Sequence, residues 1–403
     1  MISVAEAIRI VQAQTRPLPI ESVALADART RFLSEKVVAD SDLPPFDRSQ
    51  MDGYAIRASD VGQAPVSLNI VGESAAGRGW HQEMQAGAAV RIMTGAPVPK
   101  GADSVQQVEL TRESNGGAVV EILQPVVEGR SIVTRGSEIK AGQTVLQAGE
   151  VIDAATMAVL ASFGYAQVKV GGRPRVSVLA TGSELVAVTQ KPGQDQIRDS
   201  NNYSIAAYAE VAGATIEQLP LAGDDTNLLK RQLAEASERS DVVVSSGGVS
   251  VGVYDFTKAA LRELGAEIFF ERVALRPGKP IVFARLPNGT LVFGLPGNPV
   301  SVSVTFNLFA RTAILAMQGA KETELLKETA VLAKRTNGTQ DRESYIPAEL
   351  STSADGKLLA APLKWGGSSD FVGFARARAL IIVPKGLQAL EAGTLVQIVQ
   401  IPR

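Results

Sequence analysis

The sequence predicts a multidomain α/β protein in which one doubly wound α/β domain is joined to small β domains. From Arg175 onward, apolar runs alternate with segments of helical pattern, which is typical of a parallel sheet covered by helices. Residues 65–137 and the residues beyond Lys321 contain short apolar runs divided by Gly, Pro and Asn, as small β domains do. At 403 residues the chain has room for about two to three domains, which excludes a single small binding module.

Charge and reactive side chains exclude several classes of function. Forty Lys and Arg against 42 Asp and Glu give a formal net charge of -2, so no overall basic field exists to bind nucleic acid or an anionic membrane. There is no cysteine, and His81 is the only histidine, which excludes disulfides, thiolate nucleophiles and the usual zinc sites. Because no run of about 18 apolar residues occurs, we expect a cytoplasmic protein without a membrane span.

The first third of the chain contains two predicted helices around a turn-rich region. Ser3 followed by Glu6 forms a capping box, which predicts an opening helix of about three turns. Paired prolines and an Asp-Gly dipeptide in 43–57 are turn signals and place a domain boundary near residue 43. Residues 152–164 read as a second helix with Asp153 as its N-cap.

The α/β region contains buried strands such as VSVLA and DVVVSS, between which helices are expected near 201–212, 226–238 and 255–264. The segment after Asn298 is ambiguous, because alternating valines resemble a strand. We interpret it as a helix, since Asn298 can cap it, Pro299 suits its first position, and about 18 residues pass before a breaker.

A glycine-rich turn follows the strand DVVVSS and carries the strongest local signal. Gly247, Gly248 and Gly252 allow close backbone approach at the carboxyl end of a strand, which suits a ligand bearing phosphate; a tight turn without a ligand is the alternative. Residues 248–252 also match the G-x-S-x-G nucleophile elbow. That chemistry needs a histidine later in the chain, and His81 lies upstream, so a serine hydrolase is rejected.

Several acidic side chains stand at predicted strand ends of the same domain. Oxygen ligands in a chain without thiols suit Mg²⁺ held together with substrate phosphates. Taken singly, each acid is more often a helix cap or a solvated loop residue. The acids are Glu184, Asp199, Asp224, Asp225 and Asp255.

Cations around a Pro-Gly turn provide a second candidate site. Arg272, Arg276 and Lys279 could bind an oxyanion or a phosphate, with solvated turn charges as the alternative. Pro296 and Pro299 flank a predicted helix start, whose free amides also favour anions.

Two polar residues stand in turn-rich settings of the earlier β region. Asp52 precedes a glycine, and Thr94 lies in RIMTGAPVP. Without further context both are interpreted as turn residues.

In their order along nearly the whole chain, these motifs resemble those of the molybdopterin molybdenumtransferase (molybdenum insertase) family. The same pattern resembles the C-terminal domain of gephyrin, where the fold also serves as a receptor scaffold. The motifs are DRSQMDGYAIR, VRIMTGAPVPKGAD, TGSEL, IRDSN, the Asp224-Asp225 pair, SGGVSVGVYD, RPGKP and GLPGNPVSV.

The resemblance implies an elongated homodimer of four-domain subunits. It implies an α/β domain like that of molybdopterin adenylyltransferases and a C-terminal domain like a β-barrel. The implied domains are a split linking domain at 1–42 and 138–170, a small β domain at 43–137, the α/β molybdopterin-binding domain at 171–325 and the C-terminal β domain at 326–403.

The resemblance also implies a Mg²⁺-dependent reaction. Adenylylated molybdopterin is hydrolysed, AMP leaves, and molybdate enters the pterin dithiolene to give molybdenum cofactor. Contacts with the adenylyltransferase and with apo-molybdoenzymes would follow. The implied catalytic residues are Asp52, Glu184, Asp224 and Asp255, of which the last three would also ligate Mg²⁺. The implied substrate-binding residues are Thr94, Ser183, Asp199, Ser200, Asn201, Gly247, Gly248, Ser250, Arg272, Arg276, Lys279, Pro296 and Pro299.

In the implied dimer, Asp52 and Thr94 act on a ligand held by the α/β domain of the other subunit. Some positions depart from the family pattern. Arg276 stands where a lysine is frequent, and Val372 and Gly373 replace paired serines of some relatives. Arginine keeps the charge but presents a fork where lysine presents a point charge.

Two other functions fit parts of the pattern. A molybdopterin adenylyltransferase would need only residues 171–325, but it would not carry the β segments with Asp52 and Thr94. A non-enzymatic scaffold would follow the analogy with gephyrin, whereas intact Asp52 and the two site aspartates at 224 and 255 favour retained chemistry.

Overall fold

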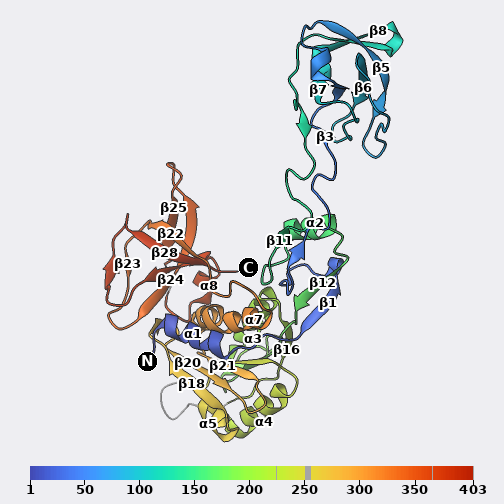
Figure 1. The fold of residues 1–403 in the computed structure, drawn as a ribbon. Helices are drawn as coiled ribbons and strands as arrows, with labels where there is room; N and C mark the ends of the chain where they lie inside the picture. Colours follow the sequence, from blue (N-terminus) through green and yellow to red (C-terminus); the bar gives the residue numbers. More distant parts are fainter. Residues whose placement is uncertain (224, 250–255, 365, 403) are drawn as a thin grey trace. The chain divides into compact units, whose positions relative to one another are not determined.

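The computed structural model describes residues 1–223, 225–249, 256–364 and 366–402. The chain forms two compact units (Figure 1): residues 1–35, 148–157 and 167–403 make one, and residues 36–147 and 158–166 make the other. Each unit contains several sheets, so the boundaries of the four implied domains stay predictions.

The central sheet of the first unit confirms the predicted α/β class. Its strand order is β16-β13-β17-β21-β20-β18. Strands β16, β13, β17 and β21 run parallel, and β20 runs antiparallel to both of its neighbours, β21 and β18. The strands are β13 (Arg175–Ala180), β16 (Thr215–Gln218), β17 (Val242–Ser246), β18 (Glu267–Arg272), β20 (Pro280–Arg285) and β21 (Leu291–Leu295).

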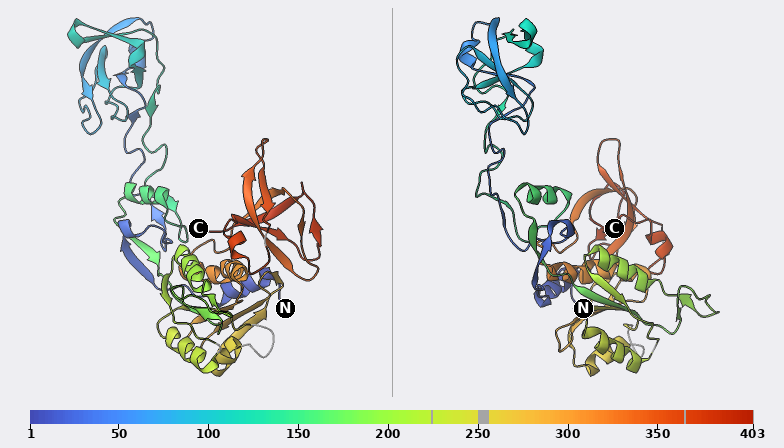
Figure 2. Two further views of the ribbon diagram at one scale, coloured as in Figure 1. Left: turned by 180° about the vertical axis from the view of Figure 1, so that it is seen from behind. Right: turned by 90° about the vertical axis from the view of Figure 1, so that its right-hand side faces the viewer.

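Helices cover both faces of this sheet (Figures 1 and 2) because both faces are apolar. Val242 and Val244 face one core and Val243 the other, as the two-residue period of a strand requires. The first core includes residues of α1 (Val4–Gln14), α3 (Asn201–Val211), α6 (Pro299–Thr305) and α7 (Arg311–Met317), and the second those of α4 (Thr226–Ser237) and α5 (Phe256–Glu263).

The ambiguous apolar segment after Asn298 is a helix, as predicted. A π-helical segment, Phe306–Ala310, connects α6 to α7. The whole run Pro299–Met317 is long and apolar enough to cross a membrane, but 89% of its most apolar window is buried inside the protein, as in a core helix of a soluble protein. The expected cap is not made by the side chain of Asn298, whose Nδ2 donates to Ser368 Oγ at 2.9 Å.

Other helix starts behave as the sequence predicts. Ser3 accepts the backbone N–H of Glu6 at 3.1 Å, and Asp153 Oδ1 accepts that of Thr156 at 2.8 Å at the start of α2 (Ala154–Ser162). Asp225 Oδ1 accepts two backbone N–H groups in the first turn of α4. These side chains satisfy amides that have no partner within the helix.

The second unit contains the predicted small β domain. Its main sheet has the order β7-β4-β6-β5-β9-β8 and apolar side chains on both faces. The strands are β4 (Gly53–Ile56), β5 (Val66–Ser74), β6 (Ala88–Ile92), β7 (Ser104–Gln107), β8 (Thr111–Ser114) and β9 (Val119–Ile122).

A closed barrel lies near the C-terminus, as the resemblance implied. The order β24-β25-β22-β28-β26 closes because β24 also pairs with β26. Ile381 points into the barrel core while Leu380 and Ile382 join the core of the α/β domain. The strands are β22 (Lys327–Leu332), β24 (Glu343–Thr352), β25 (Leu358–Pro362), β26 (Ala379–Val383) and β28 (Leu395–Gln400).

Short ladders and one short helix complete the fold. They are β1 (Ile20–Ala24) with β12 (Gln167–Gly171), β2 (Val37–Val38) with β11 (Thr144–Leu146), β3 (Arg48–Ser49) with β10 (Ile132–Val133), β14 (Leu185–Val186) with β15 (Ile197–Arg198), β19 (Leu275–Arg276) with β24, β23 (Thr336–Asn337) with β27 (Ala389–Leu390), and α8 (Phe371–Phe374).

Candidate functional site

A cavity of about 1010 Å³ lies at the carboxyl ends of β13, β17 and β21. Parallel sheets bind ligands at this edge, because loops and helix starts converge there. The cavity brings together many of the residues predicted from sequence, which are Glu184, Asp199, Ser200, Asn201, Gly247, Gly248, Pro296 and Pro299. We call it the strand-end cavity, to distinguish it from the cationic cavity described below.

The loop after β17 requires glycine. Gly247 and Gly248 have φ of 89° and 64°, in the left-handed region that glycine tolerates best. A Cβ at either position would also approach Thr181 Oγ1, to 2.8 Å from Gly247 and 3.1 Å from Gly248. The backbone is therefore held close to the loop after β13. The predicted Ser250 and Asp255 lie outside the described residues, as does Asp224.

The start of α3 contributes a buried carboxylate. Asp199 is 5% exposed, and its Oδ1 accepts the backbone N–H of Asn202 at 3.1 Å. Burial raises the pKa of Asp199, and the hydrogen bonds from Asn202 oppose this only in part. Asp199 therefore caps the start of α3, as the sequence allowed for an acid at this position, whereas Ser200 makes no side-chain cap.

Glu184 lies on the exposed part of the same cavity, in the loop between β13 and β14. Its backbone oxygen accepts the N–H of Ile197 at 2.8 Å, which ties this loop to β15. Ser183 is exposed beside it and is not among the residues lining the cavity in the described chain.

A second cavity, of about 870 Å³, is lined by cations. It shares Pro280, Pro296 and Asn298 with the first, so the two adjoin at the turn before α6. The predicted Arg276 and Lys279 lie here, whereas Arg272 is exposed at the end of β18 and lines neither cavity. The other cations come from the C-terminal domain and are Lys334, Arg335, Arg342 and Lys364.

Sequence reasoning missed these four cations for a structural reason. The short parallel ladder between β19 and β24 pairs Arg276 with Ser344, which brings the loop before β24 beside the Pro-Gly turn. Arg335 is paired with Glu391 at 3.0 Å and Arg342 with Asp341 at 3.2 Å. The adjacent basic residues at 334 and 335 are visible in the sequence, but their distance along the chain from Arg276 gives no indication that they share a cavity with it.

In the second unit, Asp52 and Thr94 are hydrogen-bonded to each other. Asp52 Oδ1 accepts the backbone N–H of Thr94 at 2.7 Å and its hydroxyl at 2.9 Å. These bonds lower the pKa of Asp52, the backbone N–H contributing most. The carboxylate is exposed, and the lowered pKa keeps it ionised near neutral pH.

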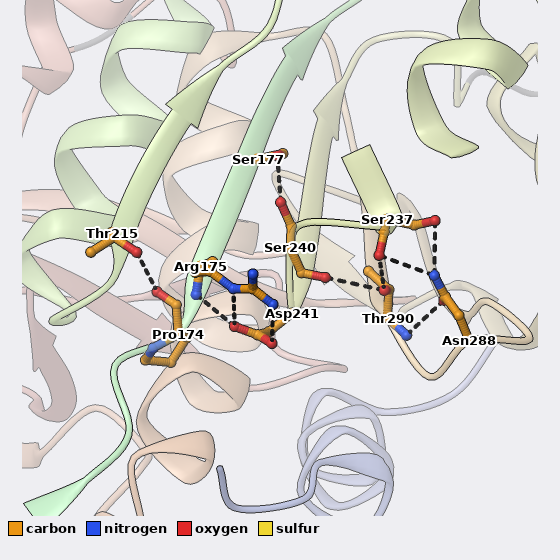
Figure 3. A network of polar contacts seen from close by, with 9 residues as sticks. All are labelled: Pro174, Arg175, Ser177, Thr215, Ser237, Ser240, Asp241, Asn288 and Thr290. Atoms are coloured by element: carbon orange, nitrogen blue, oxygen red, sulfur yellow. Dashed lines mark hydrogen bonds and ion pairs between the residues drawn. The ribbon is translucent and has the colours of Figure 1, made fainter. Parts of the chain in front are cut away.

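Figure 3 shows the opposite, amino edge of the same sheet, where a cavity of about 960 Å³ lies. Its polar side chains bind one another: the hydroxyls of Ser177 and Ser240 are 2.6 Å apart, and Thr290 Oγ1 donates to Ser240 O at 3.1 Å. Asp241 accepts the backbone N–H of Arg175 at 2.8 Å. Because these groups satisfy one another, the network fixes the strands and leaves no polar atom that requires a ligand.

The described residues do not by themselves form a magnesium site. Among them no group of three or more His, Cys, Asp and Glu side chains is arranged to hold a metal ion. Of the expected ligands only Glu184 is described, and the nearby Asp199 is buried and engaged with Asn202.

Three consecutive parts of the chain match known families. Residues 2–164 match the MoeA N-terminal region (domain I and II), residues 177–316 a probable molybdopterin binding domain, and residues 329–401 the MoeA C-terminal region (domain IV). Together they cover most of both compact units and all of the candidate site residues, and the last match includes the turn in 366–374.

Relatives match over the full length. The molybdopterin molybdenumtransferase of Bacillus subtilis is 37% identical over 413 residues, covering 99% of this chain and 94% of its own; that of a Nostoc species is 37% identical over 392 residues, covering 95% and 89%. The crystal structure of a molybdopterin biosynthesis MoeA protein from Pyrococcus horikoshii superimposes with a TM-score of 0.85 at 28% identity, over 99% of this chain and 100% of that one. A second structure of that name from the same organism gives 0.80 at 30% identity, over 100% and 99%. Since sequence and fold agree over the whole length, this chain belongs to the molybdopterin molybdenumtransferase family.

Proposed function

We propose that this enzyme of molybdenum cofactor biosynthesis inserts molybdate into adenylylated molybdopterin, releasing AMP. The observation that carries the proposal is the pair of adjoining cavities at the carboxyl edge of the sheet. One offers glycine backbone and polar acceptors, and the other offers cations. Such a division suits a reaction that joins an organic phosphate ester to an inorganic oxyanion.

The cationic cavity supplies the charge that a molybdate dianion needs. Arg276, Lys279 and Lys364 make no ion pair within the described residues, so their charges are available to a ligand. Arginine can form two parallel hydrogen bonds to an oxyanion, and lysine adds a point charge. The start of the helix that begins at Pro299 lies between the cavities, where its partial positive charge favours an anion.

Asp52 and Thr94 are proposed to complete the site from the partner subunit of a homodimer. The support is chemical: Asp52 is exposed, ionised and fixed by two hydrogen bonds, which suits a group that orients a water or a leaving group. Mg²⁺ is proposed on Glu184 with Asp224 and Asp255, where it would neutralise the charge of the phosphoanhydride.

The cellular setting is also a proposal. A cytoplasmic location fits the lack of cysteine and the near-neutral charge. Contacts with the adenylyltransferase that supplies the substrate, and with apo-molybdoenzymes that receive the product, follow from the same reaction. The adenylyltransferase alternative is disfavoured, because the matches outside residues 177–316 belong to the molybdenumtransferase architecture.

The test supplies purified protein with adenylylated molybdopterin, Mg²⁺ and molybdate. We expect release of AMP and a product that activates an apo-molybdoenzyme. Arg276→Ala should lower molybdate-dependent product formation by roughly 10- to 100-fold, because a charge-assisted bidentate contact is lost. Arg29→Ala, which removes an exposed arginine that lines neither cavity, is the matched control. No AMP release by the wild type would exclude the proposed reaction.

A further inference from the structure

A fully buried hydroxyl stands three residues before Asp52. Ser49 is 0% exposed, and its Oγ accepts the backbone N–H of Met51 at 3.2 Å and donates to Met51 O at 2.6 Å. A serine that bonds to the backbone two residues further along closes a turn through its side chain. Because Met51 O belongs to the peptide group that leads into Asp52, the hydroxyl fixes the orientation of that peptide group.

The backbone of Ser49 is attached to a second turn, which carries Thr94. The N–H of Ser49 donates to Ala96 O at 3.0 Å, and its carbonyl oxygen accepts the N–H of Gly95 at 2.9 Å. This second turn is tight, because Gly95 has a φ of 80° and the N–H of Ala96 donates to Met93 O at 3.0 Å. Thr94 therefore stands at the corner of a turn whose next two residues both bond to Ser49.

Asp52 completes the contact between the two turns. Its Oδ1 accepts the N–H and the hydroxyl of Thr94, and its backbone oxygen accepts the N–H of Val108 at 3.0 Å. The main chain around the carboxylate is thus held on both sides, by Ser49 before it and by Val108 after it. The Thr94 bonds lower the pKa of Asp52, and in the described part of the chain no charged side chain contributes to this shift. The state of the carboxylate therefore depends on the geometry of the two turns.

Another serine of the same unit is equally buried and provides a comparison. Ser104, in β7, is 0% exposed, and its Oγ donates to Ile56 O at 3.3 Å. Ser104 and Ile56 are paired in the ladder between β4 and β7, so this bond lies within the sheet and joins neither turn. The two serines share the same burial, but only Ser49 bonds to the peptide group next to Asp52.

We propose that Ser49 is a positioning residue for Asp52, because it joins the turn of residues 49–52 to the turn of residues 93–96 and so holds the carboxylate in one orientation. The inference rests on the proposed function, in which Asp52 orients a water or a leaving group and the two cavities bind the substrate. A group that acts on the reacting atoms increases the rate through its fixed orientation. Ser49 should therefore affect the rate of AMP release more than substrate binding.

The first test compares Ser49→Ala with Ser104→Ala. Loss of the Ser49 hydroxyl should lower kcat for AMP release about tenfold, with a change in KM of about twofold at most, because Asp52 loses a hydrogen bond that orients it. Ser49→Thr keeps the hydroxyl and should retain most of the rate. Ser104→Ala removes a hydroxyl of the same burial and should leave kcat nearly unchanged. Equal losses in the two alanine variants, or a Ser49→Thr variant as slow as Ser49→Ala, overturn the positioning role.

The second test measures the contact between the turns without catalysis. The backbone N–H of Thr94 donates to Asp52 Oδ1, so its hydrogen exchange reports how firmly the carboxylate is held. We expect exchange about tenfold faster in Ser49→Ala and unchanged in Ser104→Ala, at a temperature at which circular dichroism shows both variants to be folded. If Ser49→Ala does not fold, Ser49→Cys takes its place, because a thiol fills similar space and is a weaker donor. Unchanged exchange at Thr94, or faster exchange with unchanged kcat, overturns the proposal.

The outcomes separate this inference from the proposed function. If the wild type releases AMP but Ser49→Ala equals the wild type in kcat and in exchange at Thr94, the reaction stands and the positioning role is wrong. If the wild type releases no AMP and exchange at Thr94 is still faster only in Ser49→Ala, Ser49 holds Asp52 as proposed and the reaction is wrong.

Discussion

In the candidate site, burial and hydrogen bonding, more than residue type, determine the pKa of a carboxylate. Asp199 and Asp52 are both aspartates beside a turn, yet burial raises the pKa of the first, and hydrogen bonds from Thr94 lower that of the second. The exposed Asp52 is therefore the better candidate for interaction with a substrate. Asp199 organises the start of α3, and through it the position of Asn201.

Asp199 gives the stability of the protein a specific dependence on pH. Because its pKa is higher in the folded than in the unfolded state, the folded state binds the proton more tightly. Its contribution to stability is therefore present at low pH and is lost as the pH rises from 3.8, the ordinary value, through the raised native value. Asp199→Asn keeps the acceptor for Asn202 and removes this titration.

We expect the unfolding free energy of Asp199→Asn, relative to wild type, to increase as the pH rises from about 4 to about 7. Chemical denaturation at several pH values measures the difference. A difference that stays constant, or that changes in the opposite direction, would show that Asp199 is not held in a desolvated environment.

At the scale of elements, two short connections assemble the site. The β19–β24 ladder brings cations of the C-terminal domain to Arg276, and the turn before α6 connects α3 to the segment around Phe371. Leu275 of β19 also packs in the core of the α/β domain, so the β19–β24 connection is anchored on one side in the fold and carries the site on the other.

Asp370→Ala tests the second connection. Without the carboxylate, the amides of Gly366 and Gly373 lose their acceptor and should exchange with solvent about tenfold faster. Hydrogen exchange followed by NMR measures this, with Asp355→Ala in the 353–357 turn as the control. The backbone N–H groups of Gly366 and Gly373 lower the pKa of Asp370, so in the wild type the same protection should fade only as the pH falls below 3.8. Unchanged exchange would mean that backbone contacts alone hold the turn.

At the scale of the whole molecule, the candidate residues are divided between the two compact units. Asp52 and Thr94 belong to one, and the two cavities to the other. A homodimer with sites shared between subunits would bring the two sets together, and this makes a genetic prediction possible.

Co-expression of Asp52→Ala and Lys279→Ala subunits should restore about one quarter of wild-type activity. Half of the dimers would be mixed, and one of their two sites would be intact. AMP release by the mixed preparation measures the recovery. Mixing Asp52→Ala with Thr94→Ala subunits should restore no activity. Both substitutions remove a group from the same side of the site, so each site of a mixed dimer lacks one of the two groups. Absence of recovery in the first mixture would place each site within a single subunit.

Much of the fold follows from local patterns. The capping side chains of Ser3, Asp153 and Asp225 and the alternation of apolar residues in β17 are visible in the sequence, because they depend on neighbours along the chain. The family motifs likewise identified the loops that line the strand-end cavity, since the carboxyl ends of parallel strands meet at one edge of a sheet.

What the sequence by itself determined was the class of the fold, the family and the chemistry of carboxylates and cations in a chain without cysteine. Only the tertiary structure decided which polar groups are satisfied and which cations face a common cavity. Asn201, Phe371 and Lys334 are examples, because each depends on a contact across more than fifty residues of chain. Whether a polar group has a hydrogen-bond partner, and whether charges cluster, depends on distances in the folded protein. Residues that are far apart in the sequence come close only when the chain has folded.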